Sequence, residues 1–349
     1  MPKLQRLLLG SDDEELLKSA TSAVKSMVEH DADQVFAWQD SDGKGGLEVI
    51  LIVIDRLLSP SVDDNAAAEV GGLAAEVVEK AGSERLGPYL VQLLQAVAIR
   101  LSNASSAQFI QSLIIVFARL SLISAHEVVD FLAQLQIGND NGLQVVMTKW
   151  LENSVNFAGY DEIRQKFVHS HTGHVIDLTD IYNSVIALSK LYDLSDPRMS
   201  QVQVKGDLIV PRSDRIMTRS RARQNPDQYT IIPASLKIVK ILADELLSAS
   251  GTAQAMDARD AAELDDDNSD DEEWEDEPNA FLDLGLGTTK EQLMAYGEGT
   301  GNSSFSRGRD DETQAYLLGW FREAAGRPGF ADVFNSLSPT EQEKLREMS

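Results

Sequence analysis

The chain contains no cysteine among its 349 residues. This absence excludes disulfide frameworks, cysteine-based zinc sites and thiol nucleophiles, because each of them needs the sulfur atom. Catalytic signatures are missing as well: there is no G-x-S-x-G, no H-E-x-x-H and no glycine-rich turn between a strand and a helix. Carboxylates are plentiful, but those in helical stretches fall mostly on polar faces. We therefore predict that the protein is not an enzyme and uses no cofactor.

Long apolar runs are also missing. No stretch approaches the roughly 20 apolar residues that a helix needs to span a bilayer, and the apolar residues 7–9 are too few for a signal peptide. Hydrophobic residues nevertheless make up 43% of the chain, enough to bury a sizeable core. We expect a soluble protein of the nucleus or cytosol that does not insert into membranes.

Basic residues are scarce relative to acidic ones. The sequence has 31 Lys and Arg against 56 Asp and Glu, which gives a formal net charge of −25. Such a surface repels phosphate backbones and anionic lipids. The charge balance therefore argues against direct binding to nucleic acid and favours basic protein partners.

Aromatic residues make up only 6% of the chain, which is typical of thin, stacked helix layers. Residues 12–250 read almost entirely as helix, most clearly over 84–101, where apolar residues recur at three-and-four spacing. Successive helix starts lie about 20 residues apart, so pairs recur about every 40, the period of HEAT-type hairpins. The starts fall near Gly46, Asn65, Glu84, Ser105, Ser124 and Asn141. We predict an all-α fold, a HEAT/armadillo-like α-solenoid wound as a right-handed superhelix.

Composition divides the chain into five predicted segments. They are HEAT-type hairpins over 1–195, an arginine-containing loop insertion over 196–229, a solenoid helix over 230–250, a disordered acidic loop over 251–311, and a C-terminal helical cap over 312–349.

Local signals refine these segments. Ser105 and Ser106 are candidate N-caps, and residues 201–205 alternate like a short strand. Helical periodicity resumes at Ile232, and a last helix starts at residues 338–341 with proline at its first position.

The central part of the acidic loop, residues 263–277, holds eleven acidic residues and no basic one. Self-repulsion and the lack of an apolar stripe predict disorder in the free protein. Two interpretations stay open: a flexible polyanion that engages a basic protein, or a solvated linker. Trp274 favours the first, because a large ring can anchor in a partner's pocket. The candidate binding residues are Glu263, Asp265, Asp266, Asp267, Asp270, Asp271, Glu272, Glu273, Trp274, Glu275, Asp276 and Glu277.

Three further motifs admit a binding interpretation, and in each the simpler one is preferred. His169, His171 and His174 could share zinc or nickel, but they straddle a predicted loop without cysteine, so we predict no metal site. Residues 215–223 could be a nuclear localisation signal or a phosphate-binding patch, and we favour a solvated arginine loop. Residues 40–46 lack the spacing of an EF-hand or a P-loop and are predicted to be a flexible turn.

Several stretches, in their order and spacing, resemble the C-terminal part of importin-9-type karyopherin-β receptors of a fungal-like kind. They are V-M-T-K-W at 146–150, V-K-G-D at 204–207, I-M-T-R-S-R at 216–221, N-P-D-Q-Y-T-I-I-P at 225–233 and L-K-I-V-K-I-L at 236–242. The acidic block around Trp274 and the unit at 316–321 also lie where that family places such features. The resemblance covers residues 35–349, and its specificity lies in the series of pieces.

The resemblance implies a HEAT-repeat receptor, a monomer that carries basic cargo into the nucleus and releases it when the GTP form of Ran binds. The implied cargo is core histones, with the TATA-binding protein or ribosomal proteins as other candidates. It also implies contacts with nucleoporins, shuttling between cytoplasm and nucleus, and a chaperone-like masking of cargo charge. The acidic loop would face the cargo. Because the family's principal Ran-binding repeats lie in its N-terminal part, we expect this chain to correspond to the C-terminal third.

Two other functions remain as alternatives. The first is a HEAT-repeat scaffold subunit without a transport role, which would bind neither a Ran-like GTPase nor phenylalanine-glycine nucleoporin repeats. The second is an enzyme with a metal site at the three histidines, which would require stoichiometric metal in the purified protein.

Overall fold

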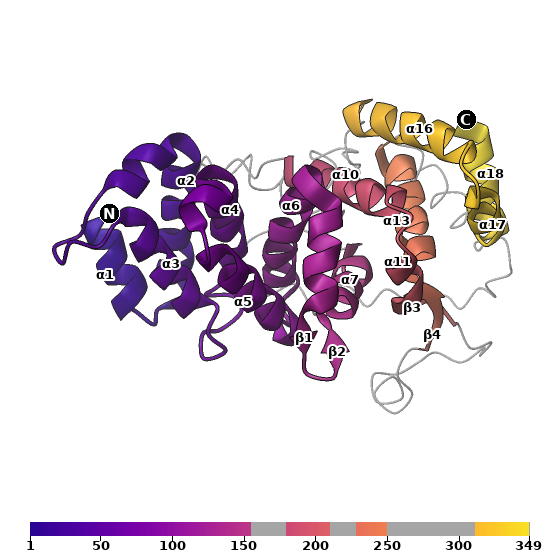
Figure 1. Cartoon of the computed structure of the whole chain (residues 1–349). Coiled ribbons are helices and arrows are strands. Elements are labelled where there is room, and N and C mark those ends of the chain that lie inside the picture. The colour runs from indigo at the N-terminus through magenta and orange to yellow at the C-terminus, as the bar shows by residue number, and fades with distance from the viewer. Residues whose placement is uncertain (155–178, 210–227, 250–310, 349) are drawn as a thin grey trace, which may run out of the picture. The chain divides into compact units, whose positions relative to one another are not determined.

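The computed structural model describes residues 1–154, 179–209, 228–249 and 311–348. Apart from turns and loops, these residues form helices and two short antiparallel ribbons (Figure 1). The helices are α1 (Pro2–Gly10), α2 (Glu14–Ala37), α3 (Gly46–Leu57), α4 (Val70–Leu86), α5 (Tyr89–Asn103), α6 (Ala107–Gln134), α7 (Gly142–Glu152), α10 (Thr179–Asp193), α11 (Pro197–Gln201), α13 (Ala234–Ala249), α16 (Asp311–Ala325), α17 (Phe330–Asn335) and α18 (Pro339–Met348). The ribbons pair β1 (Gln136–Ile137) with β2 (Asp140–Asn141) and β3 (Gln203–Leu208) with β4 (Tyr229–Pro233).

The chain divides into two compact units. One comprises Met1–Glu245 and Trp320–Ser349, and the other comprises Leu246–Gly319. The second unit contributes only the end of α13 and the beginning of α16 to the described residues. The five segments predicted from composition stay predictions, since much of 196–229 and of 251–311 lies outside the described residues.

Within the first unit, the helices from α1 to α10 stack as hairpins in two layers. In one layer α1 contacts α3 and α5 contacts α7; in the other α2, α4, α6 and α10 contact one another in turn. The two layers are joined within each hairpin, α1 with α2, α3 with α4 and α5 with α6. Figure 1 shows α2, α4 and α6 side by side. In this packing each hairpin buries its apolar stripe against its neighbours. The predicted all-α, HEAT-like class is confirmed.

The core follows α6, whose Phe109, Leu113 and Phe117 are fully buried. Burying each such side chain stabilises the fold by about 1.5–3 kcal/mol. Trp150 of α7 is also buried, and its indole nitrogen donates a hydrogen bond of 3.0 Å to the Ser184 hydroxyl of α10. The buried apolar residues of α6 thus face the interior of the array.

Contrary to the expectation that no stretch is long and apolar enough, α6 could cross a membrane by length and composition alone. Half of its most apolar window is buried, and α6 contacts α4, α5, α7 and α10. A core helix of a soluble protein passes the same test, and the packing of α6 accounts for its apolar composition.

The long helices α2, α4 and α6 are each interrupted. The interruptions fall at Asp31, at Gly82, whose φ of 63° favours glycine, and at Ser124. The Ser124 break falls where a helix start was predicted. Lys190 of α10 donates to the Leu122 carbonyl beside this break at 2.6 Å, which provides a partner near the helix end.

Of the other five predicted helix starts, three are confirmed and two are wrong. The start predicted near Ser105 is that of α6, which begins at Ala107. α3 begins at Gly46, and Asn141 caps α7 by accepting from the Gln144 amide. The start predicted at Asn65 is wrong, because turns precede α4 there. The single helix predicted over 84–101 is also wrong, because Gly87 has a φ of 49° and Pro88 follows it. The residue before a proline is disfavoured in the α conformation, so the chain restarts as α5.

The β3–β4 ribbon explains another correction. The strand predicted near residues 201–205 is present as β3, but the helix start predicted at Ile232 is wrong, because Ile232 pairs with Val204 across the ribbon. Pro233 favours an extended Ile232, and α13 begins immediately afterwards.

The predicted last helix is confirmed in detail. The Glu341 amide donates to the Ser338 hydroxyl at 3.2 Å, and the Ser338 amide donates to the Glu341 carboxylate at 2.7 Å. These reciprocal bonds form a capping box at the start of α18. Lys240 of α13 donates to the same Glu341 carboxylate at 2.7 Å, so the cap also anchors α18 to α13.

Candidate functional site

Most residues singled out from the sequence lie outside the described part of the chain. This holds for the whole acidic stretch 263–277, for His169, His171 and His174, and for the arginines of 212–223. Among the described residues, no group of three or more His, Asp or Glu side chains could hold a metal ion. The hypotheses about the acidic loop and the metal site therefore stay predictions, and the candidate site lies on the described helices.

Residues 40–46 form a turn held by its own carboxylate. Asp40 accepts from the amides of Asp42 at 2.8 Å and Lys44 at 2.9 Å, and Gln39 pairs with Gly45. The Lys44 amide is the main reason why the pKa of Asp40 lies below its ordinary value. Because this carboxylate already accepts bonds within the turn, the geometry gives no support to a calcium or phosphate site.

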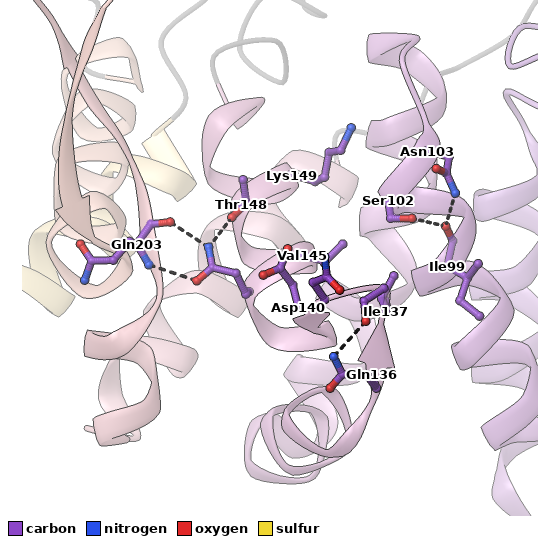
Figure 2. Close-up of a pocket in the computed structure, with 13 residues that line it drawn as sticks. Ile99, Ser102, Asn103, Gln136, Ile137, Asp140, Val145, Thr148, Lys149 and Gln203 are labelled. Atoms are coloured by element: carbon purple, nitrogen blue, oxygen red, sulfur yellow. Dashed lines mark hydrogen bonds between the residues drawn. The ribbon is translucent and has the colours of Figure 1, made fainter.

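A groove of about 940 Å³ lies between α5 and α7, beside the β1–β2 ribbon (Figure 2). We call it the amide groove, because side-chain amides and hydroxyls form most of its polar lining. It is defined here by Ile99, Asn103, Asp140, Gln144, Val145 and Lys149.

Local sequence explains why the groove has this wall. Gly138, with a φ of 62°, turns the chain between β1 and β2, and the Asn141 at the end of β2 is also the N-cap of α7. The ribbon therefore leads directly into α7, and Asp140 lies exposed at the rim of the groove.

The polar side chains of the groove are largely bonded to the protein itself. The Gln144 amide nitrogen donates to the Thr148 hydroxyl at 2.9 Å and to the Gln203 carbonyl at 2.8 Å. The Ile99 carbonyl accepts from the Asn103 amide at 3.3 Å. Gln144 thereby ties α7 to β3, and the groove wall is fixed before any partner binds.

Lys149 is the cation of the amide groove, but its charge serves the fold. Its ammonium group donates to the Ala104 carbonyl just after α5 at 2.7 Å, and Figure 2 shows it pointing away from Asp140. Burial lowers the pKa of Lys149, and the nearby carboxylates of Asp64 and Glu152 oppose this shift.

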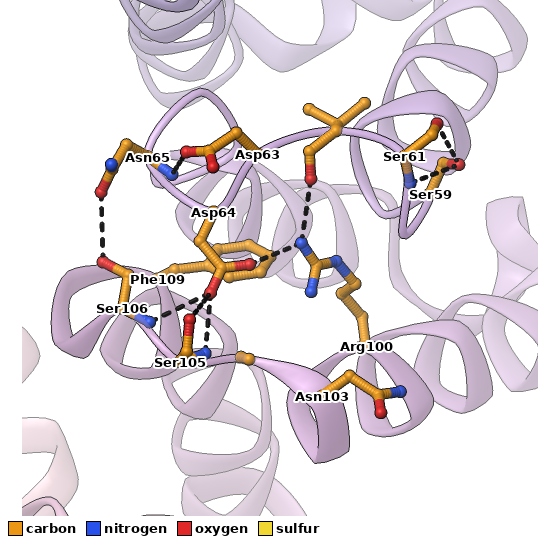
Figure 3. A network of polar contacts seen from close by, with 12 residues as sticks. Ser59, Ser61, Asp63, Asp64, Asn65, Arg100, Asn103, Ser105, Ser106 and Phe109 are labelled. Atoms are coloured by element: carbon orange, nitrogen blue, oxygen red, sulfur yellow. Dashed lines mark hydrogen bonds and ion pairs between the residues drawn. The ribbon is translucent and has the colours of Figure 1, made fainter.

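A polar network beside this groove joins the loop after α3 to the start of α6 (Figure 3). One oxygen of Asp64 accepts from the amides of Ser105 at 2.7 Å and Ser106 at 3.0 Å, and from the Ser105 hydroxyl at 3.0 Å. The other oxygen accepts from Arg100 at 2.6 Å. Ser106 occupies the predicted N-cap position, but its hydroxyl makes no capping bond. The predicted side-chain cap is therefore wrong, and the Asp64 carboxylate instead holds the two serine amides that precede the first turn of α6.

Both charges of this network are mostly buried. Only 6% of the Arg100 side chain and 14% of the Asp64 side chain are exposed, and the guanidinium lies 4.6 Å from the centre of the Phe109 ring. Burial raises the pKa of Asp64, but its amide and hydroxyl donors outweigh burial and hold the pKa at about 2. The ion pair is therefore complete at neutral pH.

Contacts between a basic side chain and a backbone carbonyl recur along the layer of α1, α3, α5 and α7. A basic side chain in the last turn of one helix donates to a carbonyl at the end of the preceding helix of this layer, or in the turn that follows that helix. The pairs are Arg56 with the Leu8 and Ser11 carbonyls, Arg100 with the Val62 carbonyl, and Lys149 with the Ala104 carbonyl.

These contacts between helices were not predicted from the sequence, although the sequence contains a signal for them. Arg56, Arg100 and Lys149 are 44 and 49 residues apart, close to the HEAT period, and each lies in the last turn of its helix. A basic residue at that position stabilises exposed helix carbonyls. These bonds connect successive hairpins along the layer.

The polar groups described above mainly hold the protein's own structure. Asp40 and Asp64 accept hydrogen bonds from backbone amides in turns, and Glu341 caps α18. The prediction that the chain is not an enzyme stays a prediction.

The chain is similar in sequence to two fungal importins over most of its length. The chain is 31% identical over 319 residues to importin subunit beta-5 of Schizosaccharomyces pombe, an alignment that covers 90% of this chain and 29% of the relative. It is also 31% identical over 281 residues to importin subunit beta-5 of Saccharomyces cerevisiae, covering 78% of this chain and 25% of the relative. The chain is related to the importins. The resemblance to importin-9-type karyopherins of a fungal-like kind is confirmed.

A more distant importin extends the comparison. Importin-9 of Drosophila melanogaster is 26% identical over 250 residues, which cover 70% of this chain and 22% of that relative. No protein-family profile matches the chain. The chain spans less than a third of the length of each of these importins. The cargo and partners of a whole importin are therefore matters of proposal for this chain.

Proposed function

We propose that the chain is part of a nuclear import receptor and binds basic protein cargo. The observation that carries this proposal is the similarity to importin subunit beta-5 over 90% of the chain. The stacked hairpins support it, because solenoids present extended binding surfaces. The net charge of −25 supports a basic partner.

Core histones are the cargo class that fits best, with the TATA-binding protein or ribosomal proteins as further candidates. The complex masks the cargo's positive charge as a chaperone does, and the GTP form of Ran releases the cargo in the nucleus. The receptor passes nucleoporins and shuttles between cytoplasm and nucleus as a monomer. Neither a cofactor nor a metal takes part.

Residues 263–277 supply the long-range attraction in this proposal, and the helical layers supply shape. A stretch of eleven carboxylates accelerates the approach of a lysine- and arginine-rich surface at low salt. The attraction weakens as the Debye length falls to about 8 Å at physiological ionic strength. Trp274 adds an apolar anchor within the same stretch.

A salt titration of binding to a core histone dimer tests this proposal. The native chain is compared with a variant in which every Asp and Glu of 263–277 becomes Asn or Gln. We expect the variant to associate on the order of ten to a hundred times more slowly at low salt, with a weaker salt dependence. Circular dichroism of the two chains should be the same.

Two controls sharpen the titration. A chain with residues 263–277 in scrambled order keeps the charge and should bind like the native chain, whereas Trp274→Ala removes only the anchor. Equal association rates of the native and neutralised chains would make the acidic stretch a solvated linker. If neither chain binds the histone dimer, the cargo proposal fails and the scaffold alternative is favoured.

A further inference from the structure

A second groove, of about 450 Å³, lies on the layer formed by α2, α4 and α6. We call it the acidic groove and define it by Glu29 of α2, Glu76 and Glu79 of α4, and Arg119, Leu120 and Ile123 of α6. It lies apart from the amide groove, which is built on α5 and α7.

The floor and one edge of the acidic groove are apolar. Val78 and Val116 are buried beneath it, and Leu120 is partly exposed. Ile123 is 74% exposed, the largest exposed fraction among the large hydrophobic side chains of the described residues. It lies immediately before the break at Ser124 and lines the groove. Such an apolar edge favours a partner that carries aliphatic surface.

The polar side of the groove is unevenly neutralised. Arg119 forms a salt bridge with the buried carboxylate of Glu76 and a second, longer one of 3.4 Å with the carboxylate of Glu79. Glu79 is 49% exposed, whereas Glu76 is only 6% exposed. The lining thus holds three carboxylates against two cations, Arg119 and Lys80. The exposed carboxylates of Glu29 and Glu79 give the groove a negative rim.

We propose that the acidic groove binds a lysine- or arginine-bearing segment of the cargo. Long basic side chains pack their aliphatic stems on apolar surface while their charged ends meet carboxylates. Leu120 and Ile123 supply the apolar contact here, and Glu29 and Glu79 receive the cations. This inference rests on the proposed function, since it assigns a place on the helices to a basic cargo. It locates a contact that is separate from residues 263–277.

The first test uses a fluorescein-labelled synthetic peptide that alternates lysine and leucine, titrated onto the full chain. The double variant Glu29→Gln, Glu79→Gln should bind this peptide about five times more weakly than the native chain, because it loses two exposed charge contacts. The matched control is Glu48→Gln, Asp55→Asn, which removes two exposed charges from α3 on the other layer. We expect the control to bind within about twofold of the native chain.

The second test detects contact with the groove by fluorescence and does not depend on a change in affinity. Because the chain has no cysteine, Ile123→Cys gives a single site for an environment-sensitive fluorophore. The basic peptide should shift the emission of this probe to shorter wavelength. The same probe at Val91→Cys, which is 55% exposed on α5, should not respond.

The outcomes separate this inference from the proposed function. If the chain binds the histone dimer but the Glu29/Glu79 variant matches its control and the Ile123 probe stays silent, the groove assignment is wrong and the cargo proposal stands. If neither the histone dimer nor the peptide binds, both are overturned. As a control, a peptide in which glutamate replaces every lysine is added to the Ile123 probe. A shift of the probe's emission with this acidic peptide would also overturn the groove assignment.

Discussion

The amide groove and the acidic groove lie in the same array of hairpins but use their charges in opposite ways. In the amide groove, Lys149 and Gln144 are bonded to the backbone of neighbouring elements. In the acidic groove, Glu79 is half exposed and shares the single cation of Arg119 with Glu76. The first arrangement stabilises the fold and the second leaves charge for a partner. Mutations should therefore affect stability at one groove and binding at the other.

The largest expected effect is at the network beside the amide groove. Arg100→Met removes the guanidinium from a mostly buried pair and leaves the Asp64 carboxylate without its cation. We expect a loss of about 3 kcal/mol in the free energy of unfolding, measured by urea denaturation. Arg322→Met, at an exposed position of α16, is the control and should change stability by less than about 0.5 kcal/mol. Equal losses for both variants would contradict the role of the network.

The same network predicts a defined pH dependence. The folded pKa of Asp64, about 2, lies below the ordinary value of 3.8, so its carboxylate stabilises the fold above about pH 4. This contribution, about 2 kcal/mol, is lost as the pH falls from about 4 towards 2. The stability difference between the native chain and Asp64→Asn should therefore shrink over that range. A difference that stays constant from pH 6 to pH 2 would show that the carboxylate's charge is not what stabilises the loop.

A smaller effect is expected at the wall of the amide groove. Gln144→Ala removes the bonds that tie α7 to β3 and should cost about 1 kcal/mol in the free energy of unfolding. Gln92→Ala, exposed on α5, is the matched control. If the two substitutions have the same effect, the groove wall is not held by Gln144.

The smallest effect on stability is expected in the acidic groove. Glu79→Gln should change the free energy of unfolding by less than about 0.5 kcal/mol, because the side chain is half exposed. Its effect should fall on the binding of basic peptides. A stability loss above about 1 kcal/mol would make Glu79 a structural residue like Asp64 and remove the contrast between the grooves.

Much of the fold could be predicted from local sequence patterns. Three-and-four spacing of apolar residues predicted the helices, and local caps such as Asn141 and the Ser338–Glu341 pair predicted where two of them begin. Predictions failed where distant residues decide. The apolar spacing places Ile232 in a helix, but Ile232 pairs with Val204 on another strand. A short window of sequence does not reveal this pairing.

The grooves and the polar network of Asp64 could not be predicted in the same way. Asp64 bonds to residues 36 to 42 positions away, and Glu76 pairs with a residue 43 positions away, so only the stacked hairpins bring them together. The basic residues in the last turns of α3, α5 and α7 were the one readable signal. Residues 263–277 show the reverse case, since their composition alone suggests a role and that role stays a prediction.

The most direct test of the central proposal is the affinity of the native chain for a core histone dimer, measured at low and at physiological salt. We expect a complex that forms readily at low salt and weakens steadily as salt increases, because carboxylates meet a basic surface. The absence of a complex at low salt, or an affinity that does not depend on salt, would contradict it.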